Sequence, residues 1–167
     1  GALADPRVRI EHRDGFAYLR EADSAFDVII LDLPDPRTED LGRLYTLEFY
    51  RLAVRALGAD GVLVTQATSP YYARETYWTI EATLAAAGLA TVPYRVHVPA
   101  FAEWGFVLGG RRVLDPAALR LDLPARWLDA NQFQAALAFD RDTSRLPDLP
   151  ASTLEAPWAW RHYRERT

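Results

Sequence analysis

Two aspartates, Asp32 and Asp35, are the residues of this chain whose type and spacing could most directly do chemistry. They follow a continuous apolar run over residues 28–31 and are held in place by Pro34 and Pro36. A buried parallel strand that ends in this way delivers carboxylates to the rim of an α/β sheet, where such folds bind ligands. A strand followed by an acidic turn would give the same local pattern, so the surrounding residues must decide between the two interpretations.

Other polar residues are expected at the same edge of the sheet. Asp14 ends the first predicted strand, Gln66 ends the third, and Glu103 lies in the turn between the last two. Aromatic side chains are candidates for the walls of a crevice there: Tyr45, Tyr71, Tyr72, Phe101 and Trp104. Carboxylates would neutralise amines, and aromatic faces would hold them by cation–π attraction. The pattern therefore predicts a cationic organic ligand.

The elements that must position these residues alternate between strand and helix. Periodicity predicts strands over residues 7–13, 26–31, 61–67, 91–99 and 104–109. It predicts helices from Gly15, over residues 41–57, from a cap at Ser69 to about Ala87, and near residues 129–139 with Asp129 as the cap. The alternation up to residue 88 predicts an α/β fold with a mostly parallel sheet, and the last two strands predict an antiparallel edge.

The character of the chain changes near residue 110. Residues 1–110 carry the alternation of strands and helices, whereas proline recurs from residue 111 onward. We interpret residues 111–167 as an extended wrap over the domain, with one or two short helices. At its end, Arg161, Arg164 and Arg166 are interleaved with aromatic residues. An anionic partner could bind there, but a docked or frayed amphipathic tail explains the pattern as well.

Composition excludes several classes of chemistry. All 19 basic residues are arginine, so Schiff-base chemistry and a P-loop lysine are excluded. There is no cysteine, and the three histidines show no metal-ligand spacing, so we expect no metal site. The net charge is −4 without a basic cluster in the core, which argues against a nucleic acid partner. No apolar run approaches the roughly 20 residues of a membrane span, and we expect this part of the protein to be soluble and cytoplasmic.

Five segments occur in a recognisable order, namely Asp14-Gly15, FDVIILDLPDP, LYTLEFY, GVLVTQATSPYYAR and VPAFAEWGFVLG. In this order they resemble the C-terminal part of the spermidine synthase (polyamine aminopropyltransferase) family. They are most similar to its bacterial branch, whose members often carry an N-terminal membrane-embedded region. The resemblance implies a partial Rossmann-like, methyltransferase-type sheet that lacks its first two strands. It also implies aminopropyl transfer from decarboxylated S-adenosylmethionine, a co-substrate, to a di- or polyamine, with no permanently bound cofactor.

The resemblance assigns roles to the two aspartates. Asp32 matches the first aspartate of the family's Asp-x-x-Asp-Pro motif, the proton acceptor, and Asp35 matches the second, which helps to bind the amine. An alkylamine with a pKa near 10 is protonated at neutral pH and has no lone pair with which to attack. A carboxylate must hold this cation and then accept or relay its proton. Asp32 could instead be a helix cap or turn former, and Asp35 a turn residue, since Asp-Pro is common in turns.

The remaining candidates follow from the same comparison of positions. Asp14 and Gly15 match the pair that contacts the adenine end of the nucleoside ligand, although Asp14 could merely cap the helix it precedes. Gln66 and Tyr45 match positions near the substrate pocket. Glu103 is either a further substrate contact or part of a solvated turn.

The chain departs from the family pattern in two ways. No G-x-G-x-x-G motif occurs in the 167 residues, so the glycine-rich loop and the acid that holds the ribose would lie upstream of Gly1. We therefore expect a fragment of a longer aminopropyltransferase that is catalytically impaired by itself. Phe101 stands near a position where better-known members have a tyrosine whose hydroxyl meets the amine, which leaves the length of the amine open.

The resemblance also predicts exposed sheet edges. The two missing strands would lie between residues 7–13 and 26–31, which leaves hydrophobic edges that favour association. We expect this edge to pair with a second chain in a homo-oligomer, or the first strand to shift across the gap. We expect contact with a membrane only through a region upstream.

Two other functions remain open at this point. An S-adenosylmethionine-dependent methyltransferase would share the sheet, because fold does not fix function. Such an enzyme must accommodate the methionine carboxylate, which acids at Asp32 and Asp35 would repel. A non-catalytic polyamine-binding or interaction domain would bind amines without turnover.

Overall fold

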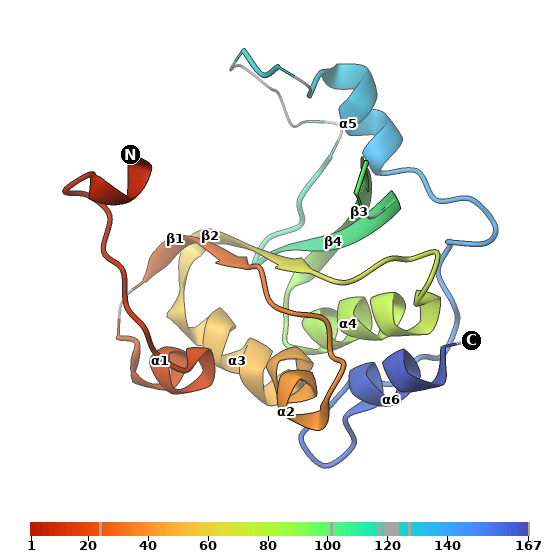
Figure 1. The fold of residues 1–167 in the computed structure, drawn as a ribbon, viewed down its shortest axis with the longest axis horizontal. Helices are drawn as coiled ribbons and strands as arrows, with labels where there is room; N and C mark the ends of the chain where they lie inside the picture. The colour runs from red at the N-terminus through yellow and green to blue at the C-terminus, as the bar shows by residue number, and fades with distance from the viewer. Residues whose placement is uncertain (24, 101, 117, 119–123, 127, 167) are drawn as a thin grey trace.

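The computed structural model describes residues 1–23, 25–100, 102–116, 118, 124–126 and 128–166. A four-stranded sheet in the order β1-β2-β4-β3 forms its centre (Figure 1). β1 (Phe26–Leu31) runs parallel to β2 (Leu57–Gln66), and β4 (Ala102–Gly110) runs antiparallel to both β2 and β3 (Ala90–Val98). The α/β fold, the parallel pair and the antiparallel edge confirm the predicted fold class.

Helices cover one face of the sheet. Below the sheet in Figure 1 lie α1 (Gly15–Glu21), α2 (Glu39–Gly42), α3 (Leu47–Ala56), α4 (Arg74–Ala86) and α6 (Trp158–Glu165). The short helix α5 (Ala130–Ala136) lies on the other side, beside β3. The described residues also form two 3-10 turns, η1 (Ala2–Ala4) and η2 (Arg43–Tyr45).

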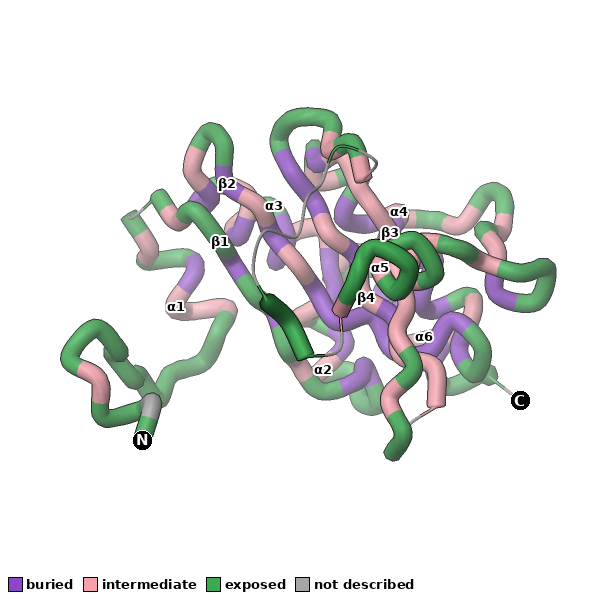
Figure 2. Tube along the Cα trace, turned by 90° about the horizontal axis from the view of Figure 1, so that it is seen from above, coloured by how far each residue is buried: buried purple, intermediate pink, exposed green. Residues whose placement is uncertain are grey.

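The hydrophobic core lies between the sheet and these helices. Its largest fully buried apolar and aromatic side chains are Tyr45, Phe49, Tyr50, Leu63, Tyr77, Ile80, Leu84 and Val107. On the opposite face of the sheet, Val28 and Ile30 are 56% and 71% exposed, and β1 alternates between buried and exposed residues (Figure 2). One face of β1 is therefore apolar and open to solvent.

Residues 7–13 form no strand, so that prediction is wrong. Val8 and Ile10 are exposed, and the segment neither joins the described sheet nor crosses to pair with β1. Alternation of apolar and polar residues is not sufficient for a strand, because the backbone N–H and C=O groups also need a neighbouring strand.

The single helix predicted over residues 41–57 is interrupted. Thr46 has an extended backbone (φ −98°, ψ 159°) and separates η2 from α3. Its hydroxyl accepts a hydrogen bond from the Phe49 N–H at 3.4 Å, which caps α3, and donates to the Arg43 carbonyl at 2.8 Å. The interruption lets Tyr45 point toward the loop that follows β1.

The other predicted helices form with small changes in their bounds. α4 begins at Arg74, after a turn in which the Ser69 hydroxyl accepts hydrogen bonds from the N–H groups of Tyr71 and Tyr72. Gly88 ends it with a φ of 98°, which favours glycine. Asp129 caps α5 as predicted and accepts from the Gln132 N–H at 2.8 Å.

The C-terminal segment returns along the helical layer. The indole Nε1 of Trp78 in α4 donates to the Thr143 carbonyl at 2.9 Å, and the Leu47 N–H donates to the Ser152 carbonyl at 2.8 Å. α6 then packs on α4, so the amphipathic end of the chain is docked (Figure 1). No helix of the described part of the chain is long and apolar enough to cross a membrane.

Candidate functional site

The parallel pair of strands brings Asp32 and Gln66 side by side. Leu31 of β1 is the register partner of Thr65 of β2, so the next residues, Asp32 and Gln66, follow at the same carboxyl edge. This is the edge at which parallel α/β sheets bind ligands. The structure therefore joins two of the residues that the sequence placed there.

The row of neighbouring residues that begins with Asp32 and Gln66 continues across the antiparallel strands. Gln66 pairs in register with Phe106 of β4, and Phe106 pairs with Tyr94 of β3. The rings of Tyr94 and Phe106 stack, with centroids 5.3 Å apart and planes at 16°. A cavity of about 250 Å³ lies against this row, and its lining residues are Ile30, Leu31, Asp32, Val64, Gln66, Tyr94 and Phe106.

Asp32 is the acid of this cavity. Its side chain is exposed, and its carboxylate makes no hydrogen bond or ion pair with any residue that the structure describes. The other lining residues are apolar or aromatic apart from Gln66 and the phenol of Tyr94. A carboxylate without a partner beside apolar and aromatic surface is suited to a ligand that is both cationic and aliphatic.

Asp35 has the opposite environment. Its residue is 7% exposed, and each of its oxygens accepts a hydrogen bond. The Gln66 amide Nε2 donates to Oδ1 at 3.1 Å, and the Tyr163 hydroxyl donates to Oδ2 at 2.9 Å. The guanidinium of Arg37 lies 3.9 Å from Oδ2. Asp35 is not among the residues that line the cavity, whereas its donor Gln66 does line it.

Gln66 lines the cavity with Asp32 and donates a hydrogen bond to Asp35. Its Nε2 also lies 2.8 Å from the Leu33 carbonyl and 2.9 Å from the Tyr45 hydroxyl, and its Oε1 accepts from the Thr68 N–H at 2.6 Å. An amide nitrogen has only two hydrogens, so three acceptors share them. Hydrogen bonds at both the nitrogen and the oxygen of the Gln66 amide therefore fix its orientation.

Tyr45 belongs to the interior of this network. It is fully buried, and its hydroxyl donates to the Pro34 carbonyl at 2.9 Å. Burial, together with the nearby Tyr50 and Asp35, raises the pKa of the Tyr45 hydroxyl far above its ordinary value. Tyr45 is thus a neutral group that stabilises the loop after β1, and the cavity does not reach it.

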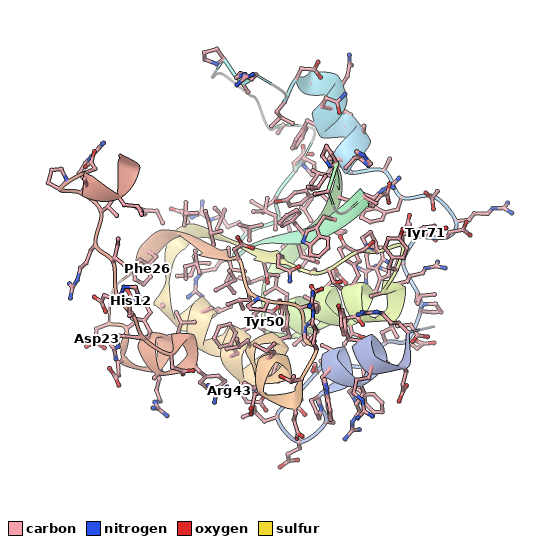
Figure 3. The ribbon with its side chains drawn as sticks, in the orientation of Figure 1. His12, Asp23, Phe26, Arg43, Tyr50 and Tyr71 are labelled. Atoms are coloured by element: carbon pink, nitrogen blue, oxygen red, sulfur yellow. The ribbon has the colours of Figure 1, made fainter. Side chains whose placement is uncertain are left out.

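Asp14 and Gly15 stand at the start of α1, away from the lining of the cavity. Asp14 caps α1 by accepting from the Ala17 N–H at 2.9 Å, and its other oxygen pairs with Arg43. These contacts, led by the Ala17 hydrogen bond, lower the pKa of the Asp14 carboxyl. In Figure 3, Arg43 lies beside α2, and Tyr71 lies apart from it, near the start of α4.

Glu103 lies at a second cavity. Its carboxylate pairs with Arg95, which also lies 3.6 Å from Asp140 and donates to the Ala138 carbonyl at 2.7 Å. The Oε2 atom of Glu103 is buried, and no described residue donates a hydrogen bond to it. This cavity, of about 240 Å³, is lined by residues of β3, β4 and α5: Arg95, Val96, His97, Glu103, Gln132, Ala135 and Ala136. The structure therefore separates Glu103 from Asp32.

The aromatic residues proposed for the crevice are also dispersed. Tyr71 and Tyr72 are exposed and meet edge to face, 5.1 Å apart, while Trp104 is partly buried in β4. Phe101 lies outside the described residues. The aromatic residues at the cavity are instead Tyr94 and Phe106, and strand alternation could have placed them on one face.

Comparison with known proteins identifies the fold and the family together. The spermine/spermidine synthase domain model matches residues 1–111, which is more than half of the chain. The chain belongs to the spermine/spermidine synthase family. The match spans the four strands and the Asp32–Asp35 motif, and it confirms the resemblance found in the sequence.

Curated relatives support this membership over nearly the whole chain. A polyamine aminopropyltransferase of Oceanobacillus iheyensis is 39% identical over 98% of this chain and 34% of its own length. Polyamine aminopropyltransferase 1 of Streptomyces coelicolor is 43% identical over 94% of this chain and 30% of its own length. A polyamine aminopropyltransferase of Mycobacterium tuberculosis is 44% identical over 94% of this chain and 31% of its own length. The chain thus spans about a third of the length of these relatives.

Solved structures show the same fold. The spermidine synthase of Thermotoga maritima superposes with a TM-score of 0.70 at 24% identity, over 83% of this chain and 49% of its own. A spermidine synthase solved in complex with the transition state analogue AdoDATO gives a TM-score of 0.71 at 24% identity, and the match covers 83% of this chain and 50% of the other. These similarities establish a spermidine synthase-like fold.

Proposed function

We propose that this chain carries the amine-binding and proton-accepting part of an aminopropyltransferase site. The proposed reaction transfers an aminopropyl group from decarboxylated S-adenosylmethionine to a di- or polyamine. One observation carries the proposal: the Asp32 carboxylate is exposed, has no protein partner among the described residues, and shares a cavity with Tyr94 and Phe106. Membership of the family supports the same reaction.

The cavity suits an alkylammonium ion. Such an amine has a pKa near 10 and enters as a cation at neutral pH. Asp32 supplies the opposite charge, and the aromatic side chains of Phe106 and Tyr94 supply cation–π attraction and apolar contact for the methylene groups. Ile30 and Val64 extend the apolar wall. The ligand expected here is therefore a short aliphatic amine.

In the proposed reaction, Asp32 accepts one proton from the ammonium group. The freed nitrogen lone pair attacks the aminopropyl carbon bonded to the sulfonium, so that a C–N bond forms as the C–S bond breaks. The electrons of the C–S bond return to sulfur and leave a neutral thioether. General base catalysis of this kind contributes about 10²–10⁴-fold to a rate. The proposed role of Asp32 is thus to hold the nitrogen and to receive its proton.

The proposed role of Asp35 is indirect. Its carboxylate holds the Gln66 amide in one orientation, and its negative charge adds to the attraction that a cation meets at this edge. Its burial and its two donors favour this positioning role over proton transfer.

For the donor nucleoside, we propose the start of α1, where Asp14 and Gly15 lie. The Asp14 carboxylate is paired with Arg43, so a nucleoside that contacts it must share or displace this guanidinium. Glu103 is neutralised by Arg95 at a separate cavity, and we do not assign it to the amine site.

The decisive test compares two sulfonium donors by calorimetry on this chain. Decarboxylated S-adenosylmethionine should bind more tightly than S-adenosylmethionine, because the carboxylate of the latter would meet Asp32. Tighter binding of S-adenosylmethionine would contradict the proposal and favour a methyltransferase. If 1,4-diaminobutane binds but neither donor does, the chain is a polyamine-binding domain, and the proposed donor site is wrong.

A further inference from the structure

The C-terminal helix reaches the buried aspartate from the far end of the chain. Tyr163 of α6 donates its hydroxyl to Asp35 Oδ2 at 2.9 Å across 128 positions of sequence. Tyr163 is itself 7% exposed, so both partners of this hydrogen bond are largely buried. Because the other oxygen of Asp35 accepts from Gln66, the carboxylate is held between one donor from β2 and one from α6.

α6 is anchored by contacts that do not involve Asp35. The backbone of Gly42 in α2 lies so close to Trp160 that a Cβ at Gly42 would be 2.7 Å from the Trp160 Cβ. The Thr79 hydroxyl lies 3.0 Å from His162 Nδ1, and the fully buried Ala159 donates its N–H to the Ser152 hydroxyl at 3.2 Å. The helix therefore presents the Tyr163 hydroxyl from a fixed position.

We propose that Tyr163 is a positioning residue of the amine site, and this inference rests on the function proposed above. It fixes the Asp35 carboxylate, Asp35 fixes the Gln66 amide, and Gln66 forms the wall of the cavity beside Asp32. The C-terminal helix thus completes the site without touching the ligand.

Loss of the hydroxyl has a defined physical consequence. A buried carboxylate oxygen would lose its donor, and an unsatisfied buried acceptor is costly. An alternative partner is the Arg37 guanidinium, which already lies 3.9 Å from Oδ2. Rotation of Asp35 toward Arg37 would take Oδ1 away from Gln66, and the Gln66 amide would lose its fixed orientation.

Tyr163→Phe tests this inference, with Tyr50→Phe as the matched control. Tyr50, labelled in Figure 3, is a fully buried tyrosine whose hydroxyl lies 3.4 Å from the Thr65 hydroxyl and makes no hydrogen bond to Asp35. The first readout is the Gln66 side-chain amide signal in ¹H–¹⁵N correlation spectra of this chain without ligand. The second readout is the affinity for 1,4-diaminobutane.

We expect the Gln66 signal to shift or broaden in Tyr163→Phe and to stay in place in Tyr50→Phe. We expect diamine affinity to fall roughly tenfold in the first variant, because the Gln66 side chain that lines the cavity loses its fixed orientation, and to be unchanged in the second. An unchanged Gln66 signal in Tyr163→Phe would overturn the inference, as would equal effects of the two variants. If the signal responds but the unmodified chain binds no diamine, Tyr163 still positions Gln66, and it is the proposed function that fails.

Discussion

Asp32 and Asp35 belong to one short motif but have opposite environments. Asp32 is exposed beside a cavity, whereas the Asp35 side chain is 5% exposed and accepts hydrogen bonds from Gln66 and Tyr163. A group that exchanges a proton with a ligand must be accessible, and a group that fixes geometry must be constrained. The environments therefore support a division of roles between the two carboxylates.

Gln66 is the residue on which this division depends. Replacing it with leucine removes the donor to Asp35, Leu33 and Tyr45 together. The Asp35 Oδ1 atom and the Thr68 N–H would lose the partner that Gln66 supplies, whereas Leu33 and Tyr45 keep other hydrogen bonds. Each buried group that loses its partner costs about 1–3 kcal/mol, so the free energy of unfolding should fall by roughly 2–6 kcal/mol in Gln66→Leu. Denaturant titration measures the change, with Gln134→Leu on the exposed face of α5 as control. Equal, small effects of both substitutions would contradict the network.

Sequence reasoning could place some of these residues and not others. Asp32 and Gln66 were predictable neighbours, because each ends a strand of a parallel pair. The contact between Tyr163 and Asp35 had no local signal, since it joins residues 128 positions apart through the docking of a helix. Glu103 was misleading, because its partner Arg95 lies on the neighbouring strand and the two neutralise each other.

At the scale of elements, the close contact between α2 and α6 decides where Tyr163 is presented. A Cβ at Gly42 would be 2.7 Å from the Trp160 Cβ, so Gly42→Ala must push the two helices apart. Such overpacking costs about 1–3 kcal/mol. We expect a lower melting temperature and a shifted Gln66 amide signal, because α6 carries Tyr163. In the control Gly15→Ala, a Cβ meets nothing within 4 Å, and stability should not fall. A Gly42→Ala variant as stable as the unmodified chain would contradict the packing.

The elements themselves were predictable where local pattern and tertiary contacts agree. β1 and the Asp129 cap of α5 follow from apolar runs and cap chemistry. Residues 7–13 have the alternation of a strand, but no neighbouring strand receives them among the described residues. The helix predicted over residues 41–57 has the right periodicity, but Thr46 bonds to its own neighbours and interrupts it.

For the whole molecule, the tyrosines of the core predict loss of stability at high pH. Burial raises the pKa of Tyr45, Tyr50 and Tyr77 above the ordinary value of about 10. The unfolded chain therefore releases these protons first as the pH passes about 10, and the free energy of unfolding should fall by up to about 1.4 kcal/mol per pH unit for each tyrosine. All 19 basic residues are arginine, so no lysine titrates in this range.

Denaturant unfolding between pH 8 and pH 11 measures this dependence. The slope above pH 10 should be smaller in Tyr50→Phe, which lacks one of the buried phenols. A free energy of unfolding that stays constant to pH 11 would contradict the burial of these hydroxyls.

The open face of β1 predicts association between copies of the chain. Val28 is 56% exposed, and β1 has a described neighbouring strand, β2, on one side only. An exposed apolar edge strand favours pairing with another chain, and a lysine on it opposes pairing. We expect concentration-dependent oligomers in sedimentation velocity, and fewer of them in Val28→Lys. Val113→Lys, at an exposed site outside the sheet, should leave association unchanged. A monomer at all concentrations would contradict this prediction.

The most direct test of the amine site is the binding of 1,4-diaminobutane to this chain and to its Asp32→Asn variant, measured by calorimetry. Asparagine keeps the shape and removes the charge, so we expect affinity to fall at least about tenfold, or roughly 1.4 kcal/mol. Asp27→Asn removes an exposed acid from β1, the strand that precedes Asp32, away from the cavity, and this variant should bind as the unmodified chain does. Equal affinities for all three proteins would contradict the assignment of Asp32.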